Sequence, residues 1–440
     1  MRGANRISGK ELEMDLTPVR GCRDFTPKDA IARARVTDVL RSVFQKYGYP
    51  PLETPALENF ETLSNKFAGG EEILRETYCL KDQGGRDLGL RYDLTVPLCR
   101  VIASNPRLAM PFKRYQIQPV WRDGPIKTGR YREFTQCDVD VLGVESLKAD
   151  AEIICLAQDA FEALELPAKM KVNNRKALNA LLEKAGVPKE KEVQAILSID
   201  KLRKIGFDGV LRELIEERGL EEETARAALN SFKEFEGKNN EEKIALLEKK
   251  LGNCEGVKEL KELLAFSNSF GVQDFVEIAP ELARGLNYYT GTVFEVYALD
   301  NEIKSSLAAG GRYDDLVGAF AGRERVPAVG ISFGLDVITA AKDFSVGESV
   351  AQCFVVPVKD CFDEAAGIAD ALRAEGVCTS IDLLDRGLGK NLEYAAKQGI
   401  PFAVIVGKKE LKEGKVTLRN LKSGEEKLLE AKDAAKIILG

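Results

Sequence analysis

The segment from Phe112 to Gly143 constrains the fold most, because it predicts two long strands joined by a short basic loop. The strands are expected in FKRYQIQPVWR and YREFTQCDVDVLG, where β-branched and aromatic residues alternate with polar ones. The connection is rich in glycine and proline, which favours a tight turn. An antiparallel hairpin is therefore predicted, with its charged side chains held on one rigid scaffold.

One face of the second predicted strand carries polar side chains whose type changes along the strand. Successive side chains of a strand point to opposite faces, so positions 132, 134, 136, 138 and 140 share a face. Arginines stand at its start, together with Arg122 and Arg130, and an amide and carboxylates follow along the strand. This arrangement suits a ligand with phosphates at one end and an amine or polar ring at the other. The alternative is a solvated edge hairpin with surface charges.

Composition limits the number of domains, the kinds of partner and the location that the chain can have. With 440 residues, of which 44% are hydrophobic, the chain is long enough for two to three domains with their own cores. The net charge of -6 gives no global case for nucleic-acid binding, so any RNA contact must be local. The 9 cysteines form no CxxC pair and histidine is absent, which argues against a zinc site and a disulfide framework. No apolar run approaches membrane-spanning length, so we expect a cytoplasmic protein that contacts no membrane.

Two segments in the first quarter of the chain predict a helix and a ligand-binding junction. Thr26 followed by Pro27 predicts the start of an amphipathic helix that ends near Gly48, and YPPLETPALE is expected to follow as a strand. In RYDLTVP, a strand turns into a helix and places Asp93 and Thr95 at the junction. Side chains at such a junction either bind a ligand or cap the helix.

The middle of the chain predicts a helical region followed by a return to strands. Lysine and glutamate recur at helical spacing up to about residue 270, which indicates solvated helix faces. Strand, strand and helix are then expected up to residue 345, with Gly310 and Gly311 allowing the backbone to approach a flat ligand. The chain contains no GxxxxGK[ST] and no GxGxxG after a strand, so a bound nucleotide would use neither a P-loop nor a Rossmann fold.

The last ninety residues predict a separate small domain. Apolar strands alternate with helices, which is typical of an α/β domain with a mostly parallel core. The segment also has a locally basic stretch, formed by Arg386, Lys390, Lys408, Lys409, Lys412, Lys415, Arg419 and Lys422. Such a stretch fits either an RNA contact or a solvated charged rim.

The hairpin resembles motif 2 of the class II aminoacyl-tRNA synthetases, in the archaeal or eukaryote-like form of the histidyl-tRNA synthetases. The resemblance extends over nearly the whole chain and is carried further by RYDLTVP, LARGLNYYTGTVFE, AGGRYDDLVG and DRGLGKNLEYAAKQGIPFAVIVG, of which the LARGLNYYTG string is the most specific. It implies an α+β catalytic domain with an antiparallel class II synthetase sheet, a helical insertion and a C-terminal α/β anticodon-binding domain. The implied boundaries are 1–168 for the first part of the catalytic domain, 169–271 for the insertion, 272–345 for the second part and 350–440 for the anticodon-binding domain.

The resemblance also implies an activity and its partners. The expected enzyme is a histidine–tRNA ligase, which uses ATP with Mg²⁺ to activate L-histidine and transfers it to tRNA(His). The insertion would approach the acceptor arm of the tRNA, and the helix and strand after Thr26 would form the motif 1 interface of a homodimer. No metal bound by protein ligands is expected.

The family assigns roles to residues of this sequence through the matching motifs. The catalytic residues would be Arg284 and Arg122, and ATP would be bound by Arg122, Arg130 and Arg132. Histidine would be bound by Asp93, Thr95, Gln136, Asp140, Tyr288 and Tyr289. This chemistry requires no histidine side chain, because the attacking carboxylate is already ionised at neutral pH and arginines can stabilise the phosphate charge.

Three positions depart from the family pattern. Val337 replaces the arginine of motif 3, Gly124 stands where an acidic residue is common, with Asp123 one place nearer, and Asn287 replaces an aspartate. Two other functions are therefore weighed beside the ligase. One is a catalytically silent regulatory subunit of histidine biosynthesis, and the other is a synthetase for proline or threonine. The LARGLNYYTG string argues against the second.

Overall fold

The computed structural model describes residues 16–64, 74–126, 129–285, 288–322, 325–344 and 349–440. The chain divides into two compact units, one formed by Met1–Asp24 with Thr37–Lys342 and the other by Phe25–Val36 with Asp343–Gly440. Across the described residues, no helix is both long and apolar enough to cross a membrane.

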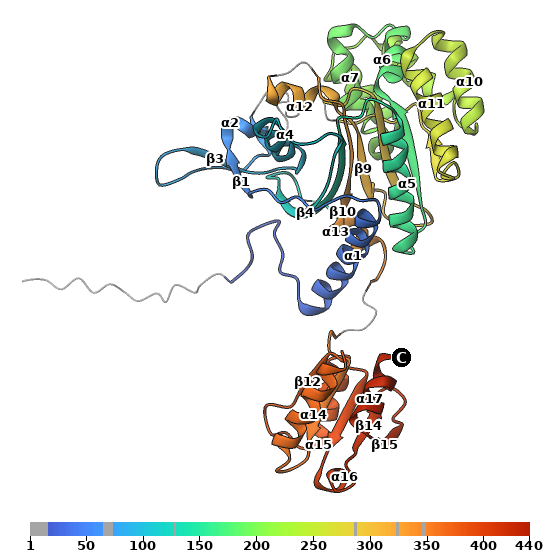
Figure 1. Ribbon diagram of the computed structural model, residues 1–440. Coiled ribbons are helices and arrows are strands. Elements are labelled where there is room, and N and C mark those ends of the chain that lie inside the picture. The colour runs from blue at the N-terminus through green and yellow to red at the C-terminus, as the bar shows by residue number, and fades with distance from the viewer. Residues whose placement is uncertain (1–15, 65–73, 127–128, 286–287, 323–324, 345–348) are drawn as a thin grey trace, which may run out of the picture. The chain divides into compact units, whose positions relative to one another are not determined.

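The first unit is built on a seven-stranded sheet with the order β4-β5-β10-β9-β8-β6-β7. All neighbouring strands are antiparallel except the β6–β7 pair, so the expected antiparallel sheet is confirmed (Figure 1). The strands are β4 (Phe112–Trp121), β5 (Glu133–Leu142), β6 (Ala168–Asn174), β7 (Val276–Ile278), β8 (Thr292–Ala298), β9 (Ala308–Arg312) and β10 (Ala328–Gly334).

The predicted hairpin is the β4–β5 pair. Arg114 lies opposite Asp140, and the register continues to Trp121 opposite Glu133. On its other side β5 pairs with β10, which makes β5 an interior strand. The last six residues of β5 are all buried, so its carboxylates do not belong to a solvated edge hairpin.

Helices pack the sheet into a core. Phe333 of β10 lies with its ring centroid 5.5 Å from Phe44 of α1 (Pro27–Lys46) and 5.6 Å from Phe161 of α5 (Lys148–Ala163). The start of α1 at Pro27 agrees with the sequence prediction. The α13 helix (Leu335–Ala341) follows β10 directly.

A smaller three-stranded sheet, β1-β3-β2, precedes the hairpin. It comprises β1 (Leu57–Asn59), β2 (Cys79–Lys81) and β3 (Asp87–Leu90), with α2 (Phe60–Leu63) beside it and α4 (Thr95–Ser104) following. The strand expected over YPPLETPALE is wrong for most of that segment, because only a single bridge at Pro51 precedes β1. Its three prolines cannot donate backbone hydrogen bonds to a strand ladder.

The region from β8 onwards has more elements than expected. The sequence prediction missed α12 (Asp314–Ala321), which packs against α4. A Cβ atom at Gly310 would lie 2.1 Å from the carbonyl oxygen of Gly330, and one at Gly311 would lie 2.4 Å from that of Thr292. These glycines are therefore required by the close approach of neighbouring strands, in addition to any contact with a ligand.

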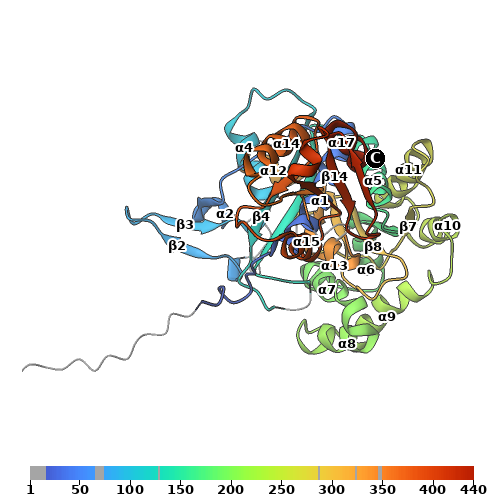
Figure 2. The ribbon, with the colours of Figure 1, turned by 90° about the horizontal axis from the view of Figure 1, so that it is seen from below.

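Helices fill the region between β6 and β7. They are α6 (Arg175–Lys184), the 3₁₀ turn η1 (Lys189–Lys191), α7 (Glu192–Ile199), α8 (Leu202–Glu216), α9 (Glu222–Lys233), α10 (Asn240–Leu251) and α11 (Glu255–Ser269). Both ribbon views show these helices gathered at the β6–β7 end of the sheet (Figures 1 and 2). The first residues of the expected 169–271 insertion belong to β6, within the seven-stranded sheet.

The second unit contains a five-stranded sheet with the order β12-β11-β13-β14-β15. The predicted strands β11 (Cys353–Pro357), β12 (Thr379–Ile381) and β13 (Phe402–Val406) are parallel, but β14 (Val416–Asn420) and β15 (Glu426–Leu429) add an antiparallel hairpin that the sequence prediction did not include. The helices are α14 (Phe362–Ala374), α15 (Leu388–Lys397), α16 (Lys408–Leu411) and α17 (Ala431–Leu439). Ala369, Leu372 and Ile438 pack on one face of this sheet.

A buried ion pair joins α5 to β9 of the larger sheet. The guanidinium of Arg312 pairs with Asp150, whose side chain is fully buried, and donates to the carbonyl of Val144 at 2.9 Å. Burial raises the pKa of Asp150, while Arg312 opposes that rise. Arg312 therefore stabilises a charge that has no access to water.

We expect Arg312→Met to lower the free energy of unfolding by about 3–5 kcal/mol, because it leaves Asp150 buried without its cation. Urea unfolding followed by fluorescence can measure this, since Trp121, the single tryptophan, reports on the first unit. Arg226→Met is the matched control, because Arg226 forms an exposed pair with Glu222 and its loss should cost less than about 1 kcal/mol. A loss below about 1 kcal/mol for Arg312→Met would contradict the conclusion that Arg312 stabilises the buried charge of Asp150.

Candidate active site

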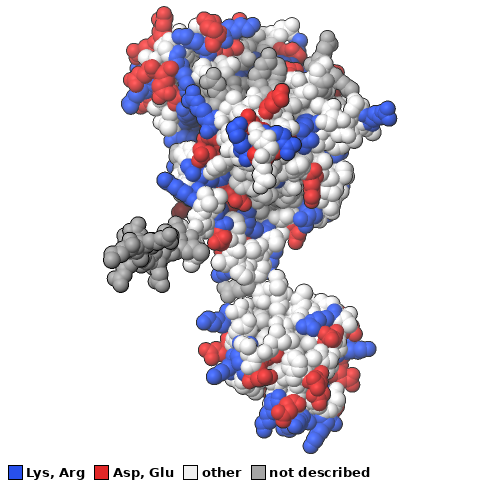
Figure 3. Space-filling model, turned by 90° about the vertical axis from the view of Figure 1, so that its left-hand side faces the viewer, with Lys and Arg blue, Asp and Glu red and all other residues white. Residues whose placement is uncertain are grey.

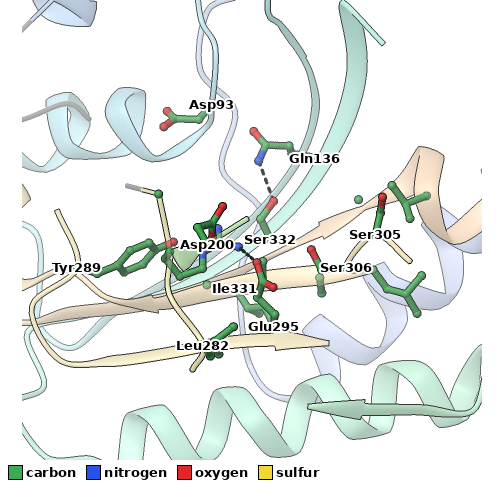
Figure 4. A pocket seen from close by; sticks show the side chains of 18 of the residues that line it. Asp93, Gln136, Asp200, Leu282, Tyr289, Glu295, Ser305, Ser306, Ile331 and Ser332 are labelled. Carbon is green, nitrogen blue, oxygen red and sulfur yellow. Dashed lines mark hydrogen bonds and ion pairs between the residues drawn. The ribbon is translucent and has the colours of Figure 1, made fainter. Parts of the chain in front are cut away.

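A cavity of about 800 Å³ opens on the larger sheet of the first unit. Its walls come from the hairpin, the β3–α4 junction, the α7–α8 connection, the segment before β8, and β9 and β10. All but one of the predicted site residues line it: Asp93, Thr95, Arg122, Arg130, Gln136, Asp140, Arg284, Tyr288 and Tyr289. Figure 4 shows Asp93, Gln136 and Tyr289 around the same open space.

Arg132 is the exception. Its guanidinium pairs with Asp123 at 2.9 Å and donates to the carbonyl of Gly124 at 3.3 Å. Its stem packs so closely on Gly21 that a Cβ there would lie 2.6 Å from Cγ of Arg132. Arg132 therefore braces the hairpin loop and does not line the cavity.

Asp93 serves the helix and the cavity together. One carboxylate oxygen accepts from the backbone N–H groups of Thr95, at 3.1 Å, and Val96, at 2.9 Å, so it caps α4. Burial raises the pKa of Asp93 to about 6, although those N–H groups and Arg122 oppose the rise. Asp93 can therefore both cap the helix and bind a ligand, because the capping residue also lines the cavity.

The cationic end of the cavity is held in place by backbone and acidic partners. Nε of Arg122 donates to the carbonyl of Tyr92 at 2.9 Å, and its guanidinium lies 5.1 Å from the ring centroid of Phe134. Arg130 bonds both oxygens of Glu76 at 3.1 Å. A Cβ at Gly124 would lie 2.7 Å from Oε1 of Glu76, so Glu76 occupies the space beside the position where the family commonly has an acidic residue.

The amide and carboxylate end lies along β5, as predicted. Nε2 of Gln136 donates to the Ser332 hydroxyl at 2.9 Å (Figure 4), and its Oε1 is buried with no partner among the described residues. Asp140 accepts from the Tyr313 hydroxyl at 2.5 Å and pairs with Arg114 at 2.7 Å. A Cβ at Gly330 would lie 1.9 Å from Oδ1 of Asp140, so the carboxylate requires a glycine on the neighbouring strand.

Aromatic rings and an ion pair form the opposite wall. The ring centroids of Tyr288 and Tyr289 are 4.8 Å apart, and that of Tyr313 lies 6.0 Å from Tyr288. Arg284 pairs with Glu295 at 2.5 Å, while its Nε is buried with no partner in the described part of the chain. Burial lowers the pKa of Arg284, but Tyr289 and Glu295 outweigh this and raise it above its ordinary value. Arg284 is therefore a fixed cation.

The position of the missing motif 3 arginine is apolar. Val337 lines the cavity, and its Cγ2 lies 3.9 Å from where a Cβ of Gly129 would stand, in the hairpin loop. The adjacent Asp336 pairs with Arg23 at 2.5 Å and accepts from the backbone N–H of Thr135 at 3.1 Å. Asn287, the third departure, lies outside the described residues, as does Lys127 of the loop.

Sequence reasoning missed several residues of this cavity. Asp138 shared the strip on β5 but received no role, so its signal was the same alternation that selected Gln136 and Asp140. Glu76, Tyr313 and Glu295 reach the cavity only through tertiary packing. Among the described residues, no cluster of three or more carboxylate, cysteine or histidine side chains is arranged as a metal site.

The antiparallel sheet, with an arginine-bearing hairpin and a cavity lined by aromatic and charged side chains, is typical of the catalytic domain of a class II aminoacyl-tRNA synthetase. The family model for histidyl-tRNA synthetase matches residues 21–338, and that for an anticodon binding domain matches residues 352–440. The chain belongs to the histidyl-tRNA synthetase family.

Individual relatives agree with this assignment. The chain is 42% identical over 424 residues to histidine–tRNA ligase 1 of Bacillus anthracis, covering 94% of this chain and 97% of that protein. It is 40% identical over 429 residues to histidine–tRNA ligase of Aeropyrum pernix, covering 96% and 97%. The crystal structure of histidyl-tRNA synthetase from Nostoc sp. PCC 7120 matches with a TM-score of 0.84 and 33% identity, covering 97% of this chain and 99% of that one.

The pKa of Asp93 predicts a pH-dependent gain in stability for Asp93→Asn. The folded state of the wild type binds a proton up to about pH 6, whereas an unfolded aspartate releases it near 3.8, so the wild type loses stability as the pH rises from 4 to 6. Asparagine retains the cap oxygen and carries no charge. The variant should therefore match the wild type at pH 4 and exceed it by on the order of 2 kcal/mol at pH 8.

Urea unfolding at the two pH values measures this difference. Asp315→Asn, at an exposed position, is the control and should differ little in stability from the wild type, because its side chain is exposed to water. An equal offset for Asp93→Asn at pH 4 and pH 8 would show that Asp93 titrates as an ordinary aspartate.

Proposed function

We propose that this protein activates L-histidine with ATP to form histidyl-adenylate and transfers the histidyl group to tRNA(His). The observation that carries the proposal is a single cavity with two fixed arginines, Arg122 and Arg284, between an aromatic pocket and a basic hairpin loop. Membership of the histidyl-tRNA synthetase family supports the choice of amino acid.

In the first step, the carboxylate of histidine attacks the α-phosphorus of ATP. A bond forms between carboxylate oxygen and phosphorus, the bond to the bridging oxygen breaks, and pyrophosphate leaves with its electron pair. No general base is needed because the carboxylate is ionised at neutral pH. Arg122 and Arg284 would stabilise the charge on the phosphate, since guanidinium groups remain charged and bind phosphate oxygens bidentately.

The two ends of the cavity suit the two ends of the amino acid. Asp93, Thr95 and Gln136 would hold the ammonium group, because Asp93 and Gln136 offer acceptor oxygens to the cavity. Tyr288, Tyr289 and Asp140 would surround the imidazole ring.

The basic loop suits ATP, with Arg130 near the phosphates and Phe134 beside Arg122. Magnesium would enter as part of the MgATP substrate, because Mg²⁺ commonly takes phosphate oxygens, waters and one or two carboxylates. Glu76 is a carboxylate at this end of the cavity that could join such a shell. With Val337 in place of the motif 3 arginine, Arg122 and Arg284 would carry more of the phosphate charge.

The regulatory-subunit alternative has less support. A neighbouring structure from Bacillus halodurans C, described as an ATP phosphoribosyltransferase regulatory subunit/histidyl-tRNA synthetase, has a TM-score of 0.73 but only 23% identity, so it supports the fold alone. The 42% identical relative from Bacillus anthracis is named as a histidine–tRNA ligase. From its membership of the family, we also propose that the protein forms a homodimer and is located in the cytoplasm.

Arg284 tests the activation step. In ATP–pyrophosphate exchange, the wild type should respond to histidine and to neither proline nor threonine. Arg284→Lys should reduce the rate by at least about tenfold and Arg284→Ala by about a hundredfold or more, because a preorganised donor to the transition state is lost. The surface variant Arg226→Ala should exchange like the wild type. Exchange by Arg284→Ala within twofold of the wild type would favour the regulatory subunit.

The second unit tests the tRNA contact. Charges of both signs are interspersed on the face of this unit in Figure 3, and several cations of the basic stretch are paired, such as Arg386 with Asp382 and Arg419 with Glu426. Lys390, Lys409, Lys412 and Lys422 have no ion pair within the described residues. These four lysines are therefore the cations most available to RNA phosphates.

We expect the combined substitution of these four lysines by alanine to raise the KM for tRNA at least tenfold, with a smaller effect at higher salt. Histidine-dependent pyrophosphate exchange should change less than twofold, because it requires no tRNA. Removing four paired cations that lie outside both the insertion and the second unit, Lys81, Arg86, Lys113 and Lys342, provides a charge-matched control. Unchanged tRNA charging by the first variant would exclude this surface as the RNA contact.

A further inference from the structure

A segment that precedes α1, residues 16–24, contacts the stem of the hairpin loop within the first unit. The carbonyl of Gly21 accepts from the backbone N–H of Arg132 at 2.9 Å, and the carbonyl of Arg132 accepts from the N–H of Arg122 at 2.8 Å. Gly21, Arg132 and the phosphate-binding candidate Arg122 are therefore joined by backbone hydrogen bonds.

Arg23 of the same segment connects the hairpin loop to the start of α13. Its guanidinium lies 3.2 Å from the ring centroid of Tyr131, next to the loop, and its Nη2 lies 2.5 Å from Oδ1 of Asp336 in α13. The other oxygen of Asp336, Oδ2, accepts from the backbone N–H of Thr135 in β5 at 3.1 Å. One carboxylate therefore joins the 16–24 segment, β5 and α13.

The burial of Asp336 makes this connection sensitive to the loss of Arg23. The side chain of Asp336 is 4% exposed, whereas that of Arg23 is 35% exposed. A buried carboxylate that loses its cation is strongly destabilised. Without Arg23, the Asp336 side chain would turn toward water, and the N–H of Thr135 would lose this acceptor. The ion pair thus holds the start of β5 against α13.

The residues on either side of Thr135 bring this connection to the cavity. Phe134 and Gln136 both line it, and the guanidinium of Arg122 lies 5.1 Å from the ring centroid of Phe134. Arg23 lies outside the described lining of the cavity. Any effect of Arg23 on a bound ligand must therefore pass through residues that do line the cavity.

We propose that Arg23 is a positioning residue for ATP, which fixes the hairpin loop against α13 and so holds Arg122 and Phe134 in the geometry that binds the nucleotide. This inference rests on the proposed function, in which the hairpin binds ATP. Because Val337 adds no cation at this end of the cavity, binding of the phosphates depends on the hairpin arginines and on the contacts that orient them.

Histidine binding should depend little on Arg23. Gln136 is held by its own hydrogen bond to the Ser332 hydroxyl, at 2.9 Å. Asp93 is held by the backbone N–H groups of the first turn of α4. The loss of Arg23 should therefore separate the binding of the two substrates.

The experiment measures, by calorimetric titration of the full-length protein, the Kd for MgATP and the Kd for histidine, each added alone. Arg23→Ala should raise the Kd for MgATP at least fivefold and change the Kd for histidine less than twofold. Arg23→Lys keeps the charge but loses the planar group that lies on Tyr131, so its Kd for MgATP should lie between those of the wild type and Arg23→Ala. The matched control is Arg373→Ala, because Arg373 pairs with Asp370 at 2.7 Å in the second unit. Both constants should remain unchanged in this control.

Equal losses of MgATP and histidine affinity in Arg23→Ala would overturn the proposal, because they would assign Arg23 to the stability of the whole sheet. An unchanged Kd for MgATP would overturn it as well. If Arg23→Ala does not fold, Tyr131→Leu removes the ring under the guanidinium and should raise the Kd for MgATP at least twofold. Wild-type affinity for MgATP in both Tyr131→Leu and Arg23→Lys would then overturn the proposal. Histidine-dependent pyrophosphate exchange by the wild type tests the proposed function separately.

Discussion

The floor of the cavity depends on the hydrogen bonds and the ion pairs that the guanidinium of Arg114 makes. This guanidinium is fully buried, and it joins β4, β5 and the β3–α4 junction through Gln116, Asp140 and the carbonyl of Leu94. Two buried carboxylates, Asp138 and Asp140, stand on the adjacent strand with this one cation between them. The floor of the cavity therefore carries excess negative charge, and a ligand rich in N–H donors complements it.

The opposite wall connects the catalytic sheet to the helical region. Arg284 pairs with Glu295, Glu295 accepts from the Tyr297 hydroxyl, and the guanidinium of Arg203 from α8 lies 3.7 Å from the centroid of the Tyr297 ring. Asp200, at the end of α7, also raises the pKa of Arg284. The position of Arg284 thus depends on side chains from β8 and from the helices between β6 and β7, which makes these helices part of the cavity wall.

The structure compensates for one departure from the family pattern, at Gly124, but not for the one at Val337. The missing acidic residue at Gly124 leaves space that Glu76 occupies from a distant segment, and this carboxylate bonds Arg130 of the same loop. The motif 3 position has no comparable exchange, because Val337 presents an apolar side chain to the cavity. Its neighbour Asp336 still ties the start of β5 to α13 through the Thr135 N–H. Asp336, the acidic residue of motif 3, is thus present, whereas the arginine that the family pattern places after it is replaced by Val337.

The amino-acid sequence alone determined the elements with local signals. Period-two alternation located β4 and β5, the Thr26–Pro27 pair located the start of α1, and alternation also placed Gln136, Asp138 and Asp140 on one face. It missed α12, which packs against α4, and the strand predicted over YPPLETPALE was wrong although the three prolines of that segment were a local signal against a strand. Nor could it predict the surroundings of Asp140. Arg114, Tyr313 and Gly330 are far away in the chain, and only the folded sheet brings them beside Asp140 on β5.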